Sequence, residues 1–456
     1  MPINPSPSYH GYDVTDYRDI NPDYGTLDDF REFVAAAHER GIAVIIDLVV
    51  NHSSVEHPWF VDAATNPDSA YADWYVWADE NPGYRGPEGQ VVWHRSGDRY
   101  YYGVFWSGMP DLNYENPDVT AEMYDIARFW LEETGIDGFR LDAIKYVVAN
   151  GELQENTPAN RAWLEAFHDY MRSVNPEALL VGEAWLNTVQ VAPYVPGSVD
   201  LAFEFELARS IVRGAAFGIT GPFREAHQRV LDLFTPGQYA TFLTNHDQDR
   251  VIDSVRGDVG AARVAASVYL TSPGVPFIYY GEEIGMSGTK PDPEIRTPMQ
   301  WYAGDGAGFT TGTPWQLINA DVAEGVNVAA QDADPGSLLN HYRGLVQARS
   351  ASRALLRGDF APVENGTGNI YSFLRYIDGE AVLVVINLRG IPFAAGDYVL
   401  SLGAGPLADV SEVEVLYADS EVGEVPLPEI NADGGFDAYT PLAELPGRGT
   451  LILRLR

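Results

Sequence analysis

The chain has 456 residues, of which 46% are apolar, so it can bury a large core and fold into two or three domains. Acidic residues outnumber basic residues 65 to 29, and the net charge of −36 argues against nucleic acid or an anionic membrane as a partner. There is no cysteine and no run of about 18 apolar residues, so neither a disulfide nor a membrane span is predicted. A neutral small molecule or polymer is the expected partner. No signal peptide is visible, and the compartment stays open.

The first predicted elements are a helix and a buried strand. Thr26 caps the helix, Asp28 and Asp29 favour its first turn, and Gly41 ends it. The run IAVIIDLVV (42–50) is too short and too rich in β-branched residues for a helix. It is typical of a strand buried on both faces of a parallel sheet. The apolar residues at helical spacing are Leu27, Phe30, Phe33, Val34 and Ala37.

Strands and helices alternate along the next part of the chain. Residues 53–108 first interrupt the pattern with five of the ten tryptophans and many turns, so we expect a small inserted domain there. Helices are then predicted over 119–134 and near 160–173. Buried strands alternating with helices predict an α/β fold, with six such strands. The strands after the insertion are expected in GIDGFRLDA (135–143), ALLVGEAW (178–185), VDLAFEFE (199–206), YATFLTNHD (239–247) and GVPFIYYGEE (274–283).

The pattern changes near residue 360. The segment YSFLRYIDGEAVLVVINL (371–388) has two alternating runs around Asp378-Gly379, which is a strong signal for a β-hairpin. More short strands follow, so we expect a separate antiparallel β-domain at the C-terminus. The predicted organisation is a barrel domain over 1–52 and 109–357, an inserted domain over 53–108 and a β-sandwich domain over 358–456.

Polar residues end each predicted strand. In GFRLDAIKY (138–146), Arg140 and Asp142 are two apart, so on a strand both point to the same side. If the strands lie side by side in an α/β barrel, Asp142, Glu183 and Asp247 converge at one rim. Such carboxylates must have separated pKa values, and Arg140 is expected to keep Asp142 ionised. Glycoside hydrolysis needs a carboxyl pair of this kind, and a separation of about 5 Å gives retention. The other strand-end residues are Asp47, Asn51, His52, Asn245, His246, Glu282 and Glu283.

Six segments, in this order, resemble the α-amylase family of retaining glycosidases, glycoside hydrolase family 13. They are DLVVNH (47–52), MPDLN (109–113), GFRLDAIKY (138–146), GEAW (182–185), FLTNHD (242–247) and GVPFIYYGEE (274–283). The resemblance extends from Tyr9 to about residue 301, and the C-terminal β-domain also matches. It implies a (β/α)8-type TIM barrel with a small inserted domain and a C-terminal antiparallel β-sandwich domain.

The resemblance also implies roles for individual residues. Asp142 corresponds to the nucleophile, Glu183 to the general acid/base, and Asp247 to the third carboxylate, which binds and distorts the sugar. Tyr12, in YHGYD (9–13), resembles the family's stacking platform. The residues that resemble its contacts to the sugar at the cleavage point are His52, Arg140 and His246. The implied partner is an α-glucan or a maltooligosaccharide.

The implied activity is hydrolysis of α-1,4-glucosidic bonds in starch-type glucans, with rivals left open. MPDLN resembles a group intermediate between α-amylases and oligo-1,6-glucosidases, and RTPMQW (296–301) also resembles the glucosidase and trehalose-synthase side. Lys145 favours an α-amylase, in which a Lys at that place contacts glucan on the leaving-group side. The alternative from another class is a non-catalytic glucan-binding relative or an inactive truncated chain. Such relatives usually lose a carboxylate of the triad, and all three are present here.

The resemblance raises the question of a calcium ion. In α-amylases the positions of Asn51 and Asp111 ligate Ca²⁺, and oxygen ligands suit this ion. A His usually stands where Tyr146 is found, but that ligand acts through its backbone carbonyl. The alternative is that Asn51 and Asp111 simply hydrogen-bond the insertion to the barrel. No organic cofactor is implied.

The start of the chain departs from the family pattern. The family barrel has eight strands, and the first two precede YHGYD, whereas Met1-Pro2-Ile3 resembles only the tail of the second. About six strands plus this tail are therefore expected, in a barrel that is N-terminally incomplete. An open barrel exposes two sheet edges. We expect a wrongly assigned start or a truncated clone; the other hypothesis is that self-association or a rearranged segment covers the gap.

Overall fold

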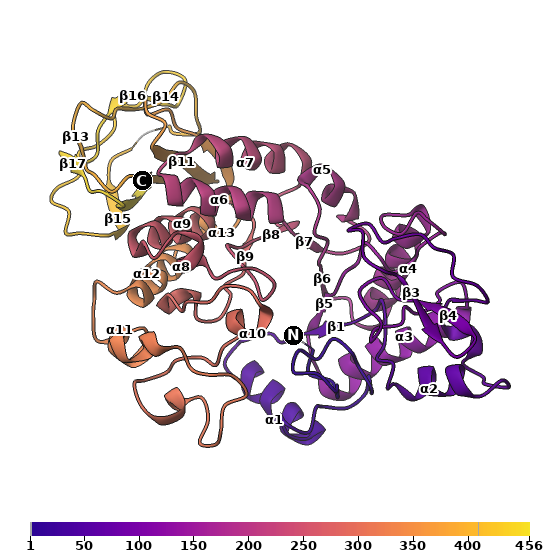
Figure 1. Ribbon diagram of the computed structural model, residues 1–456. Helices are drawn as coiled ribbons and strands as arrows, with labels where there is room; N and C mark the ends of the chain where they lie inside the picture. The colour runs from indigo at the N-terminus through magenta and orange to yellow at the C-terminus, as the bar shows by residue number, and fades with distance from the viewer. Residues whose placement is uncertain (1, 409) are drawn as a thin grey trace. The chain divides into compact units, whose positions relative to one another are not determined.

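The computed structural model describes residues 2–408 and 410–456. The chain divides into two compact units, Met1–Phe203 and Glu204–Arg456 (Figure 1). Met1, part of the predicted strand tail, lies outside the described residues, and Pro2 and Ile3 adopt irregular structure instead of a strand. The division into barrel, inserted and β-sandwich domains stays a prediction.

The first unit is built on parallel strands that lie side by side (Figure 1). Here β1 (Ile45–Leu48) pairs with β5 (Gly138–Leu141), β5 with β6 (Leu179–Gly182), and β6 with β7 (Leu201–Phe203), all parallel. Their side chains are largely buried, which confirms the expectation from their apolar composition. The helices of this unit are α1 (Leu27–His38), α2 (Pro58–Thr65), α3 (Pro117–Phe129), α4 (Pro158–Val174) and α5 (Thr188–Val191).

Local sequence explains where these helices begin. Thr26 and Asp29 form a capping box at α1, in which each side chain accepts a hydrogen bond from the other's backbone N–H. Asn116 caps α3, and Pro117 occupies its first position, where a missing N–H costs nothing. Thr157 caps α4 in the same way. The predicted helices near 26, 119 and 160 are confirmed to within a few residues.

The inserted segment folds around its own aromatic residues. The strands β2 (Trp77–Ala78), β4 (Arg99–Tyr102) and β3 (Trp93–Ser96) form an antiparallel sheet in that order. Trp93 and Tyr102 pair across it with ring centroids 5.5 Å apart, and both are buried. These rings therefore form a small core, whereas Trp106 is 50% exposed.

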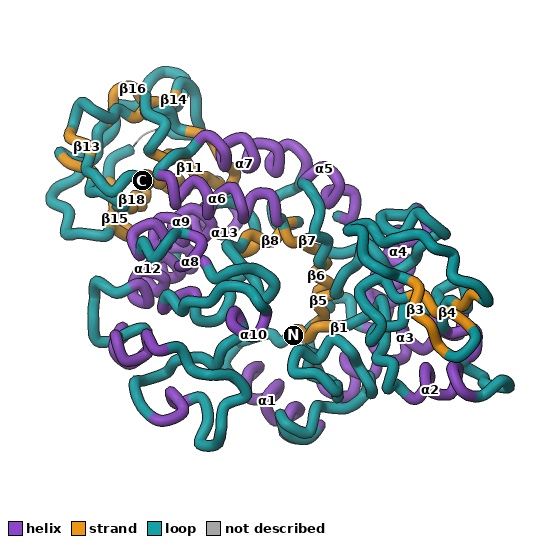
Figure 2. Tube along the Cα trace, in the orientation of Figure 1, coloured by secondary structure: helices purple, strands orange, loops and turns teal. Residues whose placement is uncertain are grey.

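The second unit opens with helices and two further parallel strands, β8 (Tyr239–Thr241) and β9 (Val275–Pro276). Helices α6 and α7 lie side by side in Figure 2. None of the helices in the described part of the chain is long and apolar enough to cross a membrane. The helices of this unit are α6 (Phe205–Phe217), α7 (Gly221–Leu233), α8 (Val251–Ser254), α9 (Val259–Thr271), α10 (Asp292–Ile295), α11 (Val328–Asp332), α12 (Leu338–Ser350) and α13 (Arg353–Arg357).

The C-terminal strands confirm the predicted antiparallel domain. β11 and β12 pair in register from Ile370–Asn387 to Ile377–Glu380, and Gly379 in the turn has a φ of 77°, which favours glycine. The main sheet has the order β10-β11-β12-β18-β15, with β13-β17 and β14-β16 as separate pairs. The strands are β10 (Asp359–Pro362), β11 (Ile370–Ile377), β12 (Glu380–Asn387), β13 (Phe393–Ala394), β14 (Leu400–Leu402), β15 (Val413–Ala418), β16 (Phe436–Tyr439), β17 (Glu444–Leu445) and β18 (Thr450–Leu455).

Candidate active site

Strand register brings two of the predicted carboxylates together. Leu141 of β5 pairs with Gly182 of β6, so Asp142 and Glu183 are the next residues on adjacent strands. The Glu183 N–H donates to the carbonyl of Leu141 at 3.0 Å, which holds this register one residue beyond the strands. Adjacent strands lie about 4.8 Å apart, and both side chains are buried at the same end of the sheet. Asp142 and Glu183 therefore face a common site.

Arg140 joins the carboxylates of this site. Its Nη1 lies 2.8 Å from Oδ1 of Asp47 and 2.5 Å from Oδ1 of Asp142. Its Nη2 lies 3.8 Å from Oε2 of Glu183. The side chain of Arg140 is only 12% exposed, so these charges interact with little screening by water. One guanidinium thus contacts three carboxylates.

Tyr12 completes this network from the N-terminal segment. Its hydroxyl donates to Oδ2 of Asp47 at 2.8 Å and accepts a hydrogen bond from Nη1 of Arg140 at 3.3 Å. The guanidinium carbon also lies 5.9 Å from the centre of the Tyr12 ring. The aromatic ring predicted as a stacking platform is therefore fixed beside Arg140 by its hydroxyl.

The two aspartates that contact Arg140 have pKa values shifted in opposite directions. Burial acts to raise the pKa of Asp47, but several lowering influences, of which the charge of Arg140 is the largest, outweigh it, so this pKa lies below its usual value. For Asp142 burial is the largest influence, and Arg140 opposes it only in part. The charges of Asp47 and Glu183 add to the effect of burial, and the pKa of Asp142 rises to about 7. The expectation that Arg140 keeps Asp142 ionised is therefore met only above this pH.

A pH profile tests this distribution of charge. If ionised Asp142 is the attacking group, kcat/KM falls as the pH drops below about 7. Asp47→Asn removes a negative neighbour and frees Arg140 for Asp142, so the acid limb should move down by roughly one pH unit. The measurement is kcat/KM on a maltooligosaccharide from pH 4 to 8, with the exposed Asp118→Asn as the control. An unchanged or raised acid limb in Asp47→Asn contradicts the prediction.

Glu183 is oriented by the backbone next to Asp142. Its Oε2 accepts a hydrogen bond from the N–H of Ala143 at 3.1 Å, and its carbonyl accepts one from Ile144 at 3.0 Å. Ala143 has a φ of 49°, a left-handed conformation that costs free energy for a residue with a Cβ. This strained residue directs its N–H at the carboxylate of Glu183 instead of continuing β5.

His52 is a neutral side chain in this site. Burial lowers its pKa to about 4. Its Nε2 lies 3.1 Å from the carbonyl of Tyr12 and must donate to it, which leaves Nδ1 as an acceptor, 3.4 Å from Nδ2 of Asn51. His52 thus holds the segment that carries Tyr12, and its ring packs edge-on against Phe105.

Lys145 has a partner within the protein. Its Nζ lies 2.8 Å from Oε2 of Glu155 and 4.6 Å from the centre of the Tyr146 ring. The side chain is buried, so a contact with glucan requires exchange of the Glu155 partner. The predicted contact of Lys145 with glucan stays a prediction.

In the second unit, Arg296 contacts the two predicted site residues Asp247 and His246. Oδ1 of Asp247 accepts a hydrogen bond from Nη2 of Arg296 at 2.8 Å, and its Oδ2 lies 3.2 Å from Nε2 of His246. Nε of Arg296 donates to the carbonyl of His246 at 2.8 Å, so one arginine positions both predicted residues. Sequence reasoning missed Arg296 as a site residue, although it begins the segment RTPMQW. That Asp247 joins Asp142 and Glu183 stays a prediction.

Glu282, another acid that was expected at a strand end, is held in a buried hydrogen-bond network. It accepts hydrogen bonds from the hydroxyls of Tyr269 at 2.9 Å and Tyr342 at 2.6 Å. Burial raises its pKa to about 8, so it is mostly protonated at neutral pH. A buried, protonated carboxyl held by two tyrosines packs helices α9 and α12 together.

The residues expected to bind calcium lie close together. Asp111 is buried, accepts a hydrogen bond from the N–H of Val104 at 3.0 Å and is hydrogen-bonded to Asn51. Burial raises its pKa to about 8. Oδ1 of Asn51 is buried with no hydrogen-bond partner among the described residues. An unpartnered amide oxygen beside a desolvated carboxylate fits a hard cation, although residues 2–408 and 410–456 contain no cluster of three or more His, Asp or Glu side chains that could hold one.

Comparisons with known proteins agree with this fold. Residues 1–358 match the family model described as "Alpha amylase, catalytic domain". Alpha-amylase 3 of Dictyoglomus thermophilum is 40% identical over 396 residues, covering 86% of this chain and 77% of that protein. Trehalose synthase/amylase TreS of Mycolicibacterium smegmatis is 33% identical, covering 84% and 75%. The crystal structure of the α-amylase from H. orenii superposes with a TM-score of 0.82 at 39% identity, over all of this chain and 89% of that one.

The chain belongs to the α-amylase family, glycoside hydrolase family 13. It has the family's TIM-barrel fold with a C-terminal antiparallel domain, and it is an amylase-type glycosidase. The predicted fold class is confirmed. The alternative hypothesis of a non-catalytic relative is therefore rejected. Because the relatives include a trehalose synthase/amylase, the particular reaction is a separate question.

Proposed function

We propose that this enzyme hydrolyses α-1,4-glucosidic bonds in starch-type glucans and maltooligosaccharides with retention of configuration. The observation that carries the proposal is the contact of a single guanidinium with both Asp142 and Glu183 on adjacent strands. Retaining glycosidases need two carboxyl groups about 5–5.5 Å apart. Neighbouring parallel strands lie about 4.8 Å apart, and this spacing supports such a separation for two residues at equivalent positions.

The two carboxyls would act in sequence. Glu183 donates its proton to the glycosidic oxygen while an oxygen of Asp142 attacks the anomeric carbon, which forms a glycosyl ester and releases the first product. Glu183, now ionised, then removes a proton from water. This water attacks the anomeric carbon, and the Asp142 carboxylate leaves. Arg140 stabilises the negative charge that Asp142 carries at the start and end of this cycle.

The neighbouring residues would bind the sugar. Tyr12 offers an aromatic face beside Arg140, and neutral His52 holds the backbone of Tyr12 in place. In the second unit, Arg296 orients Asp247 through a hydrogen bond, so that Asp247 and His246 can contact sugar hydroxyls. The substrate is an α-glucan. Nucleic acid is not expected in a chain with a net charge of −36.

Product analysis tests the proposed reaction. Maltoheptaose should be cut to shorter maltooligosaccharides whose new reducing ends are initially α, as seen by NMR, while isomaltose should turn over at least tenfold more slowly. One alternative is an oligo-1,6-glucosidase or α-glucosidase, and the other is a trehalose-synthase-like glucosyl transfer. The segment RTPMQW favours both alternatives, and the similarity to TreS favours the second. Faster turnover of isomaltose identifies the first alternative, and trehalose formed from maltose identifies the second.

We further propose that Asn51 and Asp111 hold a calcium ion that links the inserted segment to the sheet. Its chemistry would be structural, because Asp111 is hydrogen-bonded to Val104 of the insertion and Asn51 follows β1. Calcium supplies positive charge that allows the buried carboxyl to ionise. The site would thereby stabilise the loop that carries His52.

Calcium should stabilise the protein more at high pH. Without the ion, the raised pKa of Asp111 means that stability falls as the pH rises from about 4 to about 8, because the unfolded carboxyl ionises first. After chelation, millimolar CaCl₂ should therefore raise the melting temperature more at pH 8 than at pH 5. Asp111→Asn should abolish the difference and stabilise the calcium-free protein at pH 8. An equal effect of calcium at both pH values contradicts the site.

A further inference from the structure

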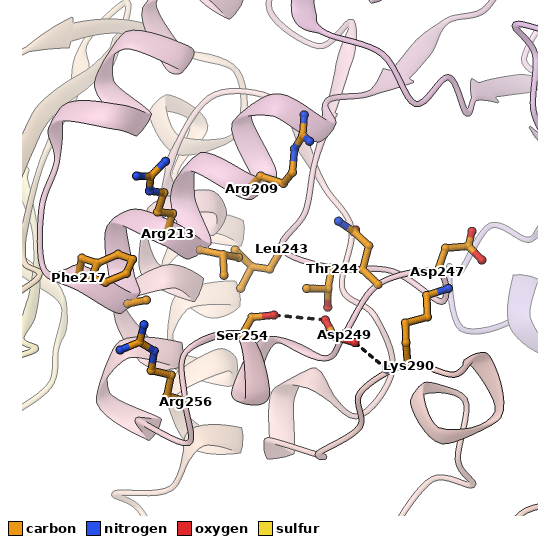
Figure 3. A pocket seen from close by; sticks show the side chains of 13 residues that line it. Arg209, Arg213, Phe217, Leu243, Thr244, Asp247, Asp249, Ser254, Arg256 and Lys290 are labelled. Carbon is orange, nitrogen blue, oxygen red and sulfur yellow. Dashed lines mark hydrogen bonds between the residues drawn. The ribbon is translucent and has the colours of Figure 1, made fainter. Parts of the chain in front are cut away.

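A basic pocket lies beside Asp247 in the second unit. It has a volume of about 450 Å³, within the range of small-molecule sites. Figure 3 shows cationic side chains from three segments around it. Arg209 and Arg213 come from α6, Arg256 follows α8, and Lys290 precedes α10. An apolar part of the wall comes from Val212, Ala216, Phe217 and Leu243, and Thr244, Gln248 and Ser254 add polar groups.

The charge of this pocket is opposite to that of the chain. Four cations line it against two carboxylates, Asp247 and Asp249, in a protein with a net charge of −36. Both carboxylates already have partners: Asp247 binds Arg296, and Asp249 accepts a hydrogen bond from the N–H of Lys290 at 2.7 Å. The pocket therefore carries surplus positive charge.

Three of the cations lack a carboxylate partner. Within the described residues, the structure gives no ion pair to Arg209, Arg213 or Arg256, and Arg256 only stacks over Phe217 at 5.2 Å. Arg209 and Arg213 are four residues apart on α6, so they lie on one helix face and repel one another. Both side chains are exposed, so this repulsion is weak, and an anion bound between these groups would relieve it.

Buried polar groups of the pocket wall also lack partners. Thr244 is 5% exposed, and its hydroxyl has no hydrogen-bond partner in the part of the chain that the structure describes. The side-chain oxygen of Gln248 is likewise buried and unpartnered. A sugar offers hydroxyls that can both donate and accept, so it can supply a donor for the oxygen of Gln248 and a partner for the hydroxyl of Thr244.

We propose that this pocket binds a sugar carrying an anionic group, a phosphate monoester or a carboxylate. The arginines pair with the anionic group, since their planar forks match its oxygens. The neutral part of the sugar packs on Leu243 and Phe217 and points towards Asp247. The inference rests on the proposed function only in that Asp247 belongs to the glycosidase site. Beyond that function, the enzyme would bind a negatively charged sugar in this pocket, either as a substrate or as a regulatory ligand.

Titration calorimetry with four probes tests the proposal. Glucose 6-phosphate and glucuronate should bind at least tenfold more tightly than glucose at an ionic strength of about 0.05 M, where screening is weak. Arg213→Gln and Arg256→Gln should each weaken the charged probes at least fivefold, and Arg213→Lys should restore part of the loss. Arg357→Gln, at the exposed end of α13, is the matched control and should bind as the parent does. The tighter of the two charged probes identifies the anionic group.

Three results would overturn the proposal. Equal binding of glucose and both charged probes removes the need for an anion. If Arg213→Gln and Arg256→Gln bind the charged probes as tightly as the parent does, the anion binds outside this pocket. Inorganic phosphate, the fourth probe, binding as tightly as glucose 6-phosphate shows that no sugar is recognised. Maltoheptaose hydrolysis is measured in parallel, so failure of the pocket is distinguished from failure of the proposed reaction.

Discussion

Asp142→Asn should lower turnover of maltoheptaose by about 10⁴-fold or more and leave binding of maltooligosaccharides nearly unchanged. The amide cannot form the glycosyl ester, so no covalent route remains. Binding should persist because Arg140 keeps Asp47 as a partner and the amide occupies the same volume. Single-turnover kinetics and titration with the substrate measure the two quantities separately.

The fold should tolerate this substitution. Burial raises the pKa of Asp142 to about 7, so its ionised form is not strongly favoured in the native protein, and its loss should change the melting temperature little. Asp118→Asn, in the exposed first turn of α3, is the matched control and should retain full activity. Near-parental turnover in Asp142→Asn would show that another group is the nucleophile.

Arg140→Met should destabilise the protein by about 3–5 kcal/mol at pH 7, because it leaves buried carboxylates without a counter-charge. Asp47 and Asp142 would then have pKa values above those of the unfolded chain. Stability of the variant is therefore fully present at low pH and is lost as the pH rises through the raised folded-state pKa values. Chemical denaturation at pH 4.5 and pH 7 should show a deficit that grows with pH.

Two further variants make this result specific to Arg140. Arg140→Lys retains the positive charge but not the paired N–H donors of the guanidinium. Its loss of stability should therefore be smaller than that of Arg140→Met. Arg128→Met removes exposed ion pairs to Asp125 and Glu132, and it should not reproduce the pH dependence. A deficit in Arg140→Met that is the same at both pH values would mean that lost packing, and not uncompensated charge, explains the effect.

The pair at the centre of the site could be predicted from sequence. Asp142 and Glu183 each follow a buried strand directly, and adjacent parallel strands end at one edge, so their proximity follows from the strand pattern. The two-residue spacing of Arg140 and Asp142 similarly indicated that their side chains point to one side. The structure confirms that these three side chains lie together.

Other features depend on contacts that no local pattern specifies. Arg140 lies opposite Asp47 because β1 pairs with β5, and this contact leaves the pKa of Asp142 above its usual value. Glu282 was expected at a strand end like Glu183, but β9 ends at Pro276, and two tyrosines from separate helices hold Glu282 in a buried network. Burial and distant partners therefore decide which strand-end acid is available for chemistry.

The basic pocket was equally hidden from sequence reasoning. Its arginines and Lys290 are spread over more than 80 residues, from α6 to the segment before α10. No periodic pattern links them, and each one alone resembles a solvated surface charge. Packing of α6 against α8 and the segment before α10 brings them around one volume.

Trapping of the covalent intermediate is the most direct test that Asp142 and Glu183 form a retaining pair. A fluorinated α-glucosyl fluoride, which slows release of the ester, should label Glu183→Gln or the parent enzyme with one glucosyl group per chain. Digestion and mass spectrometry should find this label on the peptide that contains Asp142. A label on any other carboxylate, or steady hydrolysis with inversion and no label, would contradict the assignment.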